Sequence, residues 1–215
     1  MPSPARATSS GGDPRAELRK AAGPQADREY RRLMEAATAY DAERYKDARR
    51  IIEPLARRYP SALSIRELYG LTLYRQGEYA KAIKELTTFT DRTSSTEQHP
   101  VLMDCYRALA NWDDVARLWT ELRDASPSGE LVTEGRIVMA GALADQGRLR
   151  EALQLLQKGP VEPKRAKPHH LRLWYALADL EERSGNVPRA RALFEQVRRR
   201  DGAFADVAER LAALG

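Results

Sequence analysis

The sequence predicts an all-α protein, a solenoid of helix–turn–helix repeats closed by a C-terminal helix. From Asp27 onward, apolar residues recur at spacings of three and four, and no stretch keeps a convincing strand alternation. In addition, one triad recurs five times at intervals of 33 to 38 residues. It consists of a large side chain, a small one three positions later and a large one four positions after that. Periods of this length indicate stacked units that bury a continuous core.

Each triad marks the second helix of one repeat. The five triads are Tyr45-Ala48-Ile52, Tyr79-Ala82-Leu86, Trp112-Val115-Trp119, Leu149-Ala152-Leu156 and Val187-Ala190-Phe194. Gly77, Gly147 and Gly185 lie two residues before the first triad member, which predicts first helices that end in a left-handed residue. Pro60 and Pro127 lie fifteen residues after it, where the second helix is expected to stop.

Small residues precede the triads by nine positions in four repeats, where the two helices of a pair need to approach closely. These residues are Ala36, Gly70, Ala140 and Ala178. The same phase gives the expected boundaries of the repeats, which are 29–62, 63–95, 96–130, 131–160 and 170–202. A proline-containing linker over 157–170 suggests bending between the fourth and fifth repeats.

The two ends of the chain differ in character. Residues 1–24 are rich in proline, glycine and serine and are expected to form a disordered tail, with one helical turn over Arg15–Ala22. The solenoid then extends over 25–215. Its last segment, 203–214, is expected to be a capping helix that covers the apolar end of the fifth repeat. Glu209 and Arg210 are expected to point away from that repeat.

The repeat pattern resembles the tetratricopeptide repeat family. The fifth repeat has Trp174-x2-Leu177-Ala178 followed by Ala190-x3-Phe194, and the second has Tyr69-Gly70 followed by Ala82-x3-Leu86. The resemblance covers roughly residues 28 to 202, and it departs from the family pattern at Val115, where alanine is expected. It implies a right-handed solenoid and is closest in character to bacterial proteins of this family that act in the cytoplasm.

Composition excludes several other classes. The chain is 42% apolar and 31% charged, and its longest uncharged apolar run, residues 137–144, is far shorter than the roughly 20 residues of a membrane span. The N-terminus lacks the apolar segment of a secretory signal. A single cysteine, Cys105, excludes an intramolecular disulfide and fits a reducing compartment. We therefore expect a cytoplasmic protein without a membrane segment.

No pattern of residues indicates catalysis, a metal or a cofactor. His169 and His170 are adjacent and cannot both face one metal from a helix, where ligands need a spacing of three or four. Cys105 has no histidine near it in sequence, which favours a core role. Phosphate-binding glycine loops are absent. We expect a protein that is not an enzyme and uses no cofactor.

The resemblance implies that first-helix residues line a concave groove that holds an extended peptide or a helix of a protein partner. Tyrosine and arginine are frequent anchors of such interfaces. The residues assigned to the groove are Tyr40, Glu67, Tyr74, Arg75, Asp104, Arg107, Arg172, Tyr175 and Asp179. Tyr40 and Tyr74 could equally serve in packing between repeats. Leu33 and Ala37 stand where family members that bind a terminal carboxylate have polar residues, so that ligand is not expected.

Nucleic-acid binding is the alternative function. The formal net charge is +5, and basic residues cluster at 164–167 and 198–200. However, residues 97–130 are acidic, which argues against one continuous track for phosphates. Arginines at a helix end are also favoured by the helix dipole alone. Binding to RNA, DNA or a ribonucleoprotein is therefore the less favoured hypothesis.

Overall fold

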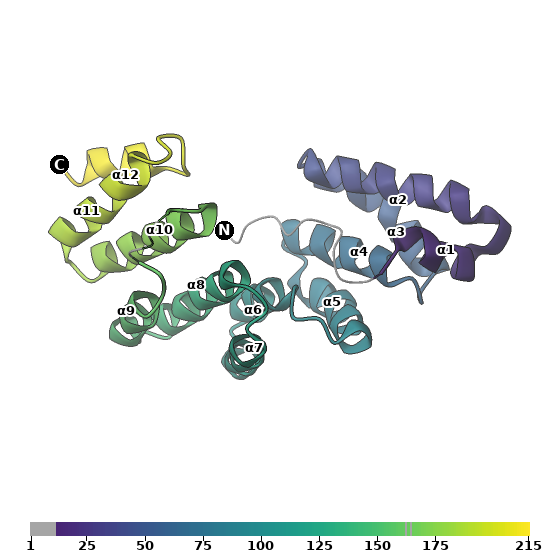
Figure 1. Cartoon of the computed structure of the whole chain (residues 1–215), viewed down its shortest axis with the longest axis horizontal. Coiled ribbons are helices and arrows are strands. Elements are labelled where there is room, and N and C mark those ends of the chain that lie inside the picture. Colours follow the sequence, from purple (N-terminus) through teal and green to yellow (C-terminus); the bar gives the residue numbers. More distant parts are fainter. Residues whose placement is uncertain (1–11, 162, 164) are drawn as a thin grey trace. The chain divides into compact units, whose positions relative to one another are not determined.

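The computed structural model describes residues 12–161, 163 and 165–215, and within these residues it contains helices and no strand (Figure 1). Five helix pairs follow one another along the chain. They are α2 (Ala26–Asp41) with α3 (Tyr45–Arg58), α4 (Leu63–Arg75) with α5 (Tyr79–Thr93), α6 (His99–Ala108) with α7 (Trp112–Ala125), α8 (Gly129–Asp145) with α9 (Leu149–Gln157), and α10 (Pro168–Arg183) with α11 (Val187–Arg198). The predicted all-α class of helix–turn–helix repeats is confirmed.

The chain divides into two compact bodies, which we call the N-terminal body and the C-terminal body. The N-terminal body ends at Leu118 and the C-terminal body begins at Trp119, so the division falls inside α7. Each body has its own core. In the C-terminal body the core includes Trp174 and Phe194, both from the predicted fifth repeat. The fully buried side chains of the N-terminal body include Ile52, Leu86 and Phe89.

Every helix pair turns through a residue with positive φ. Gly77, Gly147 and Gly185 have φ values of +76°, +77° and +84°, as their spacing predicts. In the first and third repeats the corresponding residues are Glu43 at +57° and Ala110 at +56°. These two side chains adopt a conformation that costs a residue with a Cβ about 1 kcal/mol or more. Glycine is thus the easiest signal of this turn, although two of the five turns form without it.

The two helices of a repeat approach most closely at the small residue of the first helix. Ala36, Ala140 and Ala178 are fully buried. At Gly70 of α4, a Cβ atom would lie only 2.6 Å from Leu86 Cγ of α5. The third repeat departs from this rule, because the fully buried Met103 stands at the corresponding position of α6.

The N-terminal segment is a docked helix, where a disordered tail with one helical turn over Arg15–Ala22 was expected. Helix α1 (Pro14–Ala22) begins after Asp13, whose carboxylate accepts a hydrogen bond from the Arg15 N–H. A 3₁₀ turn, Gly23–Gln25, leads from α1 into α2. The predicted disordered tail is therefore wrong for this segment, because Leu18 is fully buried and Glu17 is hydrogen-bonded to α4. Residues 1–11 lie outside the described part of the chain.

The C-terminal closing helix is shorter than expected. Helix α12 covers Val207–Ala213, and its Val207 and Leu211 are buried against the C-terminal body. Arg210 does not point away as predicted, because its guanidinium lies 5.0 Å from the centroid of the Phe194 ring and pairs with Glu182 of α10. Among the described residues, no helix has the length and apolar character needed to cross a bilayer.

Replacing Gly70 with alanine tests the close contact between α4 and α5. Alanine favours a helix over glycine by about 1 kcal/mol, but the added methyl group collides with Leu86, and overpacking a core costs about 1–3 kcal/mol. Gly70→Ala is therefore expected to lower the free energy of unfolding, as measured by urea denaturation followed by circular dichroism. Gly129→Ala is the control, since a Cβ there meets no atom within 4 Å. A Gly70→Ala protein as stable as the Gly129→Ala protein would contradict the close contact.

Candidate functional site

In the N-terminal body, the first helices of the second and third repeats are joined by a tyrosine and an aspartate from the predicted groove. The Tyr74 hydroxyl of α4 donates to Asp104 Oδ2 of α6 over 2.7 Å. Burial, together with the Asp104 carboxylate, raises the pKa of Tyr74. Asp104 also pairs with Arg107 one turn further along α6, at 3.3 Å. The structure thus favours a packing role for Tyr74 and leaves Asp104 and Arg107 partly exposed beside it.

Glu67 lies deeper than a groove residue should. Its side chain is buried, with a residue exposure of 2%, and Glu67 Oε1 accepts a hydrogen bond of 2.7 Å from Gln98 Nε2. Burial raises the pKa of Glu67 to about 7, against a smaller opposing effect of the Gln98 hydrogen bond. Gln98 Oε1 has no hydrogen-bond partner. A protonated Glu67 therefore suits this contact between α4 and α6 better than a carboxylate does.

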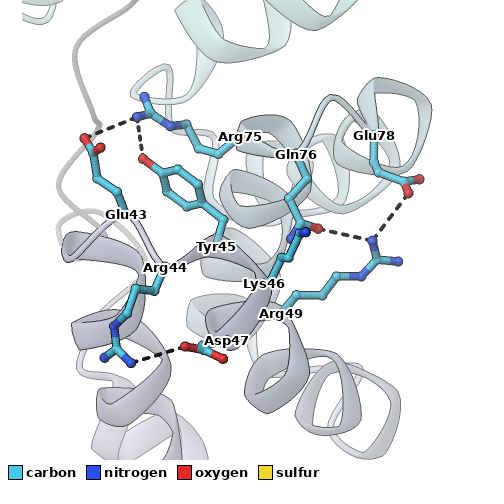
Figure 2. A pocket seen from close by; sticks show the side chains of 9 residues that line it. All are labelled: Glu43, Arg44, Tyr45, Lys46, Asp47, Arg49, Arg75, Gln76 and Glu78. Atoms are coloured by element: carbon cyan, nitrogen blue, oxygen red, sulfur yellow. Dashed lines mark hydrogen bonds and ion pairs between the residues drawn. The ribbon is translucent and has the colours of Figure 1, made fainter.

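Arg75 and Tyr40 both contact the aromatic ring of Tyr45. The Arg75 guanidinium lies 4.9 Å from the Tyr45 centroid, hydrogen-bonds to the Tyr45 hydroxyl, and approaches Glu43 to 3.7 Å (Figure 2). The Tyr40 ring packs edge-on against Tyr45 at 5.4 Å. Burial raises the pKa of Tyr40 to about 12. Tyr40 is therefore a packing residue, whereas Arg75 keeps one side toward solvent.

Glu43, Tyr45 and Arg75 border an open hollow of about 890 Å³ at the helix turns of the first two repeats (Figure 2). Its lining residues are Glu43, Arg44, Tyr45, Lys46, Asp47, Arg49, Arg75, Gln76 and Glu78. Arg44 pairs with Asp47 at 3.2 Å, and Arg49 with Glu78 at 3.3 Å. Of these residues only Arg75 was predicted to lie on the binding face, because the others come from turns and second helices. The hollow is a surface of paired charges that presents no reactive group.

In the C-terminal body, the three predicted groove residues also contact neighbouring helices. Arg172 of α10 pairs with Glu134 of α8. The Tyr175 hydroxyl donates to Asp206, and its ring lies 5.4 Å from Phe194. Burial and then Asp206 raise the pKa of Tyr175 to about 12.

Asp179 completes this set of contacts. Its carboxylate accepts from Arg210 of α12 at 2.9 Å and pairs with Arg183 of α10 at 3.8 Å. The segment around α12 therefore takes up two of the predicted groove residues, Tyr175 and Asp179.

The residues considered for catalysis and metal binding have structural roles. Cys105 is fully buried, and burial raises the pKa of its thiol to about 12, so it is not a thiolate near neutral pH. His170 Nδ1 accepts the Lys167 N–H over 2.8 Å at the start of α10, and the His169 ring lies 4.1 Å from that of His170. Among the residues that the structure describes, no group of three histidine, cysteine, aspartate or glutamate side chains is placed to hold a metal ion.

The two basic clusters have different surroundings. Lys164 lies outside the described residues, while Arg165 and Lys167 are exposed. At the end of α11, Arg198 pairs with Glu195 at 2.9 Å. The following Arg199 and Arg200 are exposed.

The raised pKa of Glu67 predicts how stability depends on pH. The folded protein holds the Glu67 proton to a pKa of about 7, against 4.5 for a glutamate exposed to water. This contribution to stability is fully present below pH 4.5 and is lost as the pH rises through about 7. A shift of this size corresponds to about 3 kcal/mol. Glu67→Gln is therefore expected to be less sensitive than the wild type to a change from pH 5 to pH 8, measured as the free energy of unfolding in urea.

The control for this measurement is Glu35→Gln, which removes an exposed carboxyl group from α2. It is expected to keep the wild-type difference between pH 5 and pH 8. If Glu67→Gln also kept that difference, Glu67 would be ionised in the folded protein and the proposed protonated contact with Gln98 would be wrong.

Comparison with known proteins bears on the family. Three family models, each described as a tetratricopeptide repeat, match residues 33–91, 133–158 and 171–214. These three matches leave out residues 92–132, which include the third repeat with its unusual Met103 and Val115. A search of curated proteins finds no match.

A solved structure has the same fold. It is a tetratricopeptide repeat protein from Thermus thermophilus, 18% identical in sequence, with a TM-score of 0.68 over 86% of this chain and 98% of that one. The helix pairs, the left-handed turns and the three family matches agree with one another. The chain belongs to the tetratricopeptide repeat family.

Proposed function

We propose that this chain is a non-catalytic scaffold that binds a peptide or a helix of a partner protein on the face formed by its first helices. Tetratricopeptide repeats serve generally in protein–protein interaction, and repeat architectures of this kind present extended surfaces for that purpose. The observation that carries the proposal is a partly exposed set of charged residues on neighbouring first helices of the N-terminal body. This set, the charged row, consists of Arg75, Asp104 and Arg107.

The charged row is held in place by buried neighbours. The Tyr74 hydroxyl positions the Asp104 carboxylate, and the Tyr45 ring supports the Arg75 guanidinium. Side chains that are ordered in advance lose less conformational entropy on binding, which favours affinity. Arginine also offers a planar set of donors for carboxylates. We therefore expect a partner segment with acidic residues to bind at Arg75 and Arg107.

The remaining predicted groove residues act as supports in this proposal. Tyr40, Glu67 and Tyr74 are buried between helices of the N-terminal body. In the C-terminal body each of the three predicted residues is paired within the body. The pairs are Arg172 with Glu134, Tyr175 with Asp206, and Asp179 with Arg210. Their loss should therefore affect stability more than direct recognition.

The chemistry of the buried groups favours a scaffold over an enzyme. Cys105 is a buried thiol whose pKa is raised to about 12, which argues against nucleophilic use. We also propose a cytoplasmic location, since the free Cys105 fits a reducing compartment.

Charge reversal on the charged row tests the proposal. The double variant Arg75→Glu/Arg107→Glu is expected to capture at least tenfold less partner protein than the wild type from a lysate of the source cells. The measurement is affinity capture with quantitative mass spectrometry, after nuclease treatment. Helicity, followed by circular dichroism, should be unchanged, because both guanidinium groups lie at the surface of their helices.

The matched control carries the same change of charge on another face. Arg50→Glu/Arg57→Glu alters two arginines of α3 whose side chains are each 78% exposed, and it should capture partners as the wild type does. Equal loss in both double variants would point to a nonspecific effect of charge. Partners that disappear after nuclease treatment would instead support the alternative of nucleic-acid binding through the basic residues of 165–167 and 198–200.

A further inference from the structure

The short helix α1 packs onto the first helices of the first two repeats. Helix α1 contacts both α2 and α4 (Figure 1). Its Leu18 side chain is fully buried. The chain turns back from α1 at Gly23, whose φ of +55° and ψ of −125° are readily adopted only by glycine. A segment that precedes the repeats in sequence thus covers part of the N-terminal body.

Helix α4 depends on α1 for the hydrogen bonds at its start. Its N-cap residue is Ala62, which has no side chain that can accept a hydrogen bond, and its first turn contains no acidic residue. Glu17 of α1 supplies what is missing. Glu17 Oε1 accepts from the Leu63 N–H at 3.0 Å, and Glu17 Oε2 accepts from the Ser64 N–H at 3.0 Å and from Ser64 Oγ at 2.6 Å.

This arrangement is unusual within the chain. Helix α1 is capped by its own Asp13 and helix α8 by its own Ser128, each only a few residues from the N–H group that it satisfies. Glu17 lies 46 residues before Leu63 in sequence. The carboxylate also faces the positive end of the α4 dipole, which favours an anion there. The start of α4 therefore behaves as a receptor for a carboxylate delivered by another helix.

The attachment of α1 is limited. The helix has nine residues, and its one fully buried side chain is that of Leu18. Isolated helices of this length are marginal in water, so α1 owes its order to docking. Its ion pair from Arg15 to Asp27 is exposed, with side-chain exposures of 50% and 71%. A competing helix would have to replace chiefly one carboxylate and one leucine.

We infer that the site filled by Glu17 and Leu18 is an exchangeable binding site, whose external ligand is a partner helix carrying an acidic residue followed by leucine. The inference rests on the proposed function, because it assumes that the first helices receive a protein segment. It adds to the proposed function the chemistry of one ligand and identifies α1 as the segment that competes with that ligand. In the free protein α1 occupies the site, and a partner binds by displacing α1 from α4.

A fluorescent peptide with the sequence of residues 12–25 is the probe. It is titrated against three full-length chains by fluorescence anisotropy. The variant Glu17→Gln/Leu18→Ala weakens the docking of α1 and should bind the peptide at least tenfold more tightly than the wild type. The control Arg19→Ala/Lys20→Ala changes two exposed residues of α1 and should behave as the wild type does. We call Glu17→Gln/Leu18→Ala the opened variant. A peptide with Glu17 replaced by glutamine should bind the opened variant at least tenfold more weakly than the unchanged peptide does.

Several outcomes would overturn the inference. The peptide could bind equally to the wild type and to Glu17→Gln/Leu18→Ala, or it could bind to neither. The peptide with glutamine in place of Glu17 could also bind as tightly as the unchanged peptide. Binding only through a dimer that exchanges α1 between two copies, detected by light scattering, would also overturn it, because the ligand would then be the chain itself. A failure here with an intact effect of Arg75→Glu/Arg107→Glu on partner capture would leave the proposed function in place.

Hydrogen exchange on the wild type keeps the inference testable if the opened variant does not fold. An exchangeable α1 must open without unfolding of the body beneath it. The amides of residues 18–22 should then exchange at least tenfold faster than the most protected amides of α2 and α4. Their exchange should become faster still when the peptide of residues 12–25 is bound in excess, because the bound peptide displaces α1. Exchange of α1 at the rate of α2 in the free protein would show a fixed structural element and contradict the inference.

Discussion

The close approach of the two helices in four of the five repeats is the constraint on which the rest of the structure depends. In these repeats the first helix carries a small residue, and in the second repeat this residue, Gly70, lies against the large Leu86 of the second helix. This contact sets the distance within a pair, and the left-handed residue at the turn sets its direction. Once both are fixed, the apolar stripes of successive pairs can stack into the core of each body. The interaction surfaces follow from this stacking, because it decides which side chains are covered.

A second regularity links neighbouring first helices. Asp104 reaches Tyr74, which lies 30 residues before it, and Gln98 reaches Glu67, which lies 31 residues before it. The separations in the C-terminal body are the same, since Tyr175 bonds to Asp206 and Asp179 to Arg210 across 31 residues. In each case the separation is 30 or 31 residues, which is shorter than the intervals of 33 to 38 residues between triads. Helix α12 and the residues before it therefore stand in relation to α10 as α6 stands to α4.

Much of the fold could be predicted from the sequence, because helix periodicity and repeat spacing are local signals. The family resemblance and the all-α class are confirmed. The turns at Glu43 and Ala110 gave no signal, since the stacking of the helices forces residues other than glycine into a left-handed conformation. The docking of helix α1 onto the repeats was missed for a related reason. Its composition is polar, and only the distant N–H groups of Leu63 and Ser64 explain why it is ordered.

The candidate site was harder to predict than the fold. Helical phase placed Tyr40, Glu67 and Tyr74 on the proposed binding face, but phase does not show how closely the next helix approaches. In the structure these side chains are buried, and Glu67 holds its proton to a pKa of about 7. Arg75 and Arg107 keep contact with solvent, with side-chain exposures of 20% and 33%. Burial by the adjacent repeat therefore separates supporting residues from residues that can meet a partner.

The central claim is that a protein partner contacts the first-helix face of the N-terminal body. Site-specific photo-crosslinking tests it most directly, with p-benzoylphenylalanine placed at position 107 of α6 or at position 50 of α3. We expect a crosslink to a protein partner from position 107 and none from position 50. A crosslink from position 50 alone would place the partner on the second helices and contradict binding on the first-helix face.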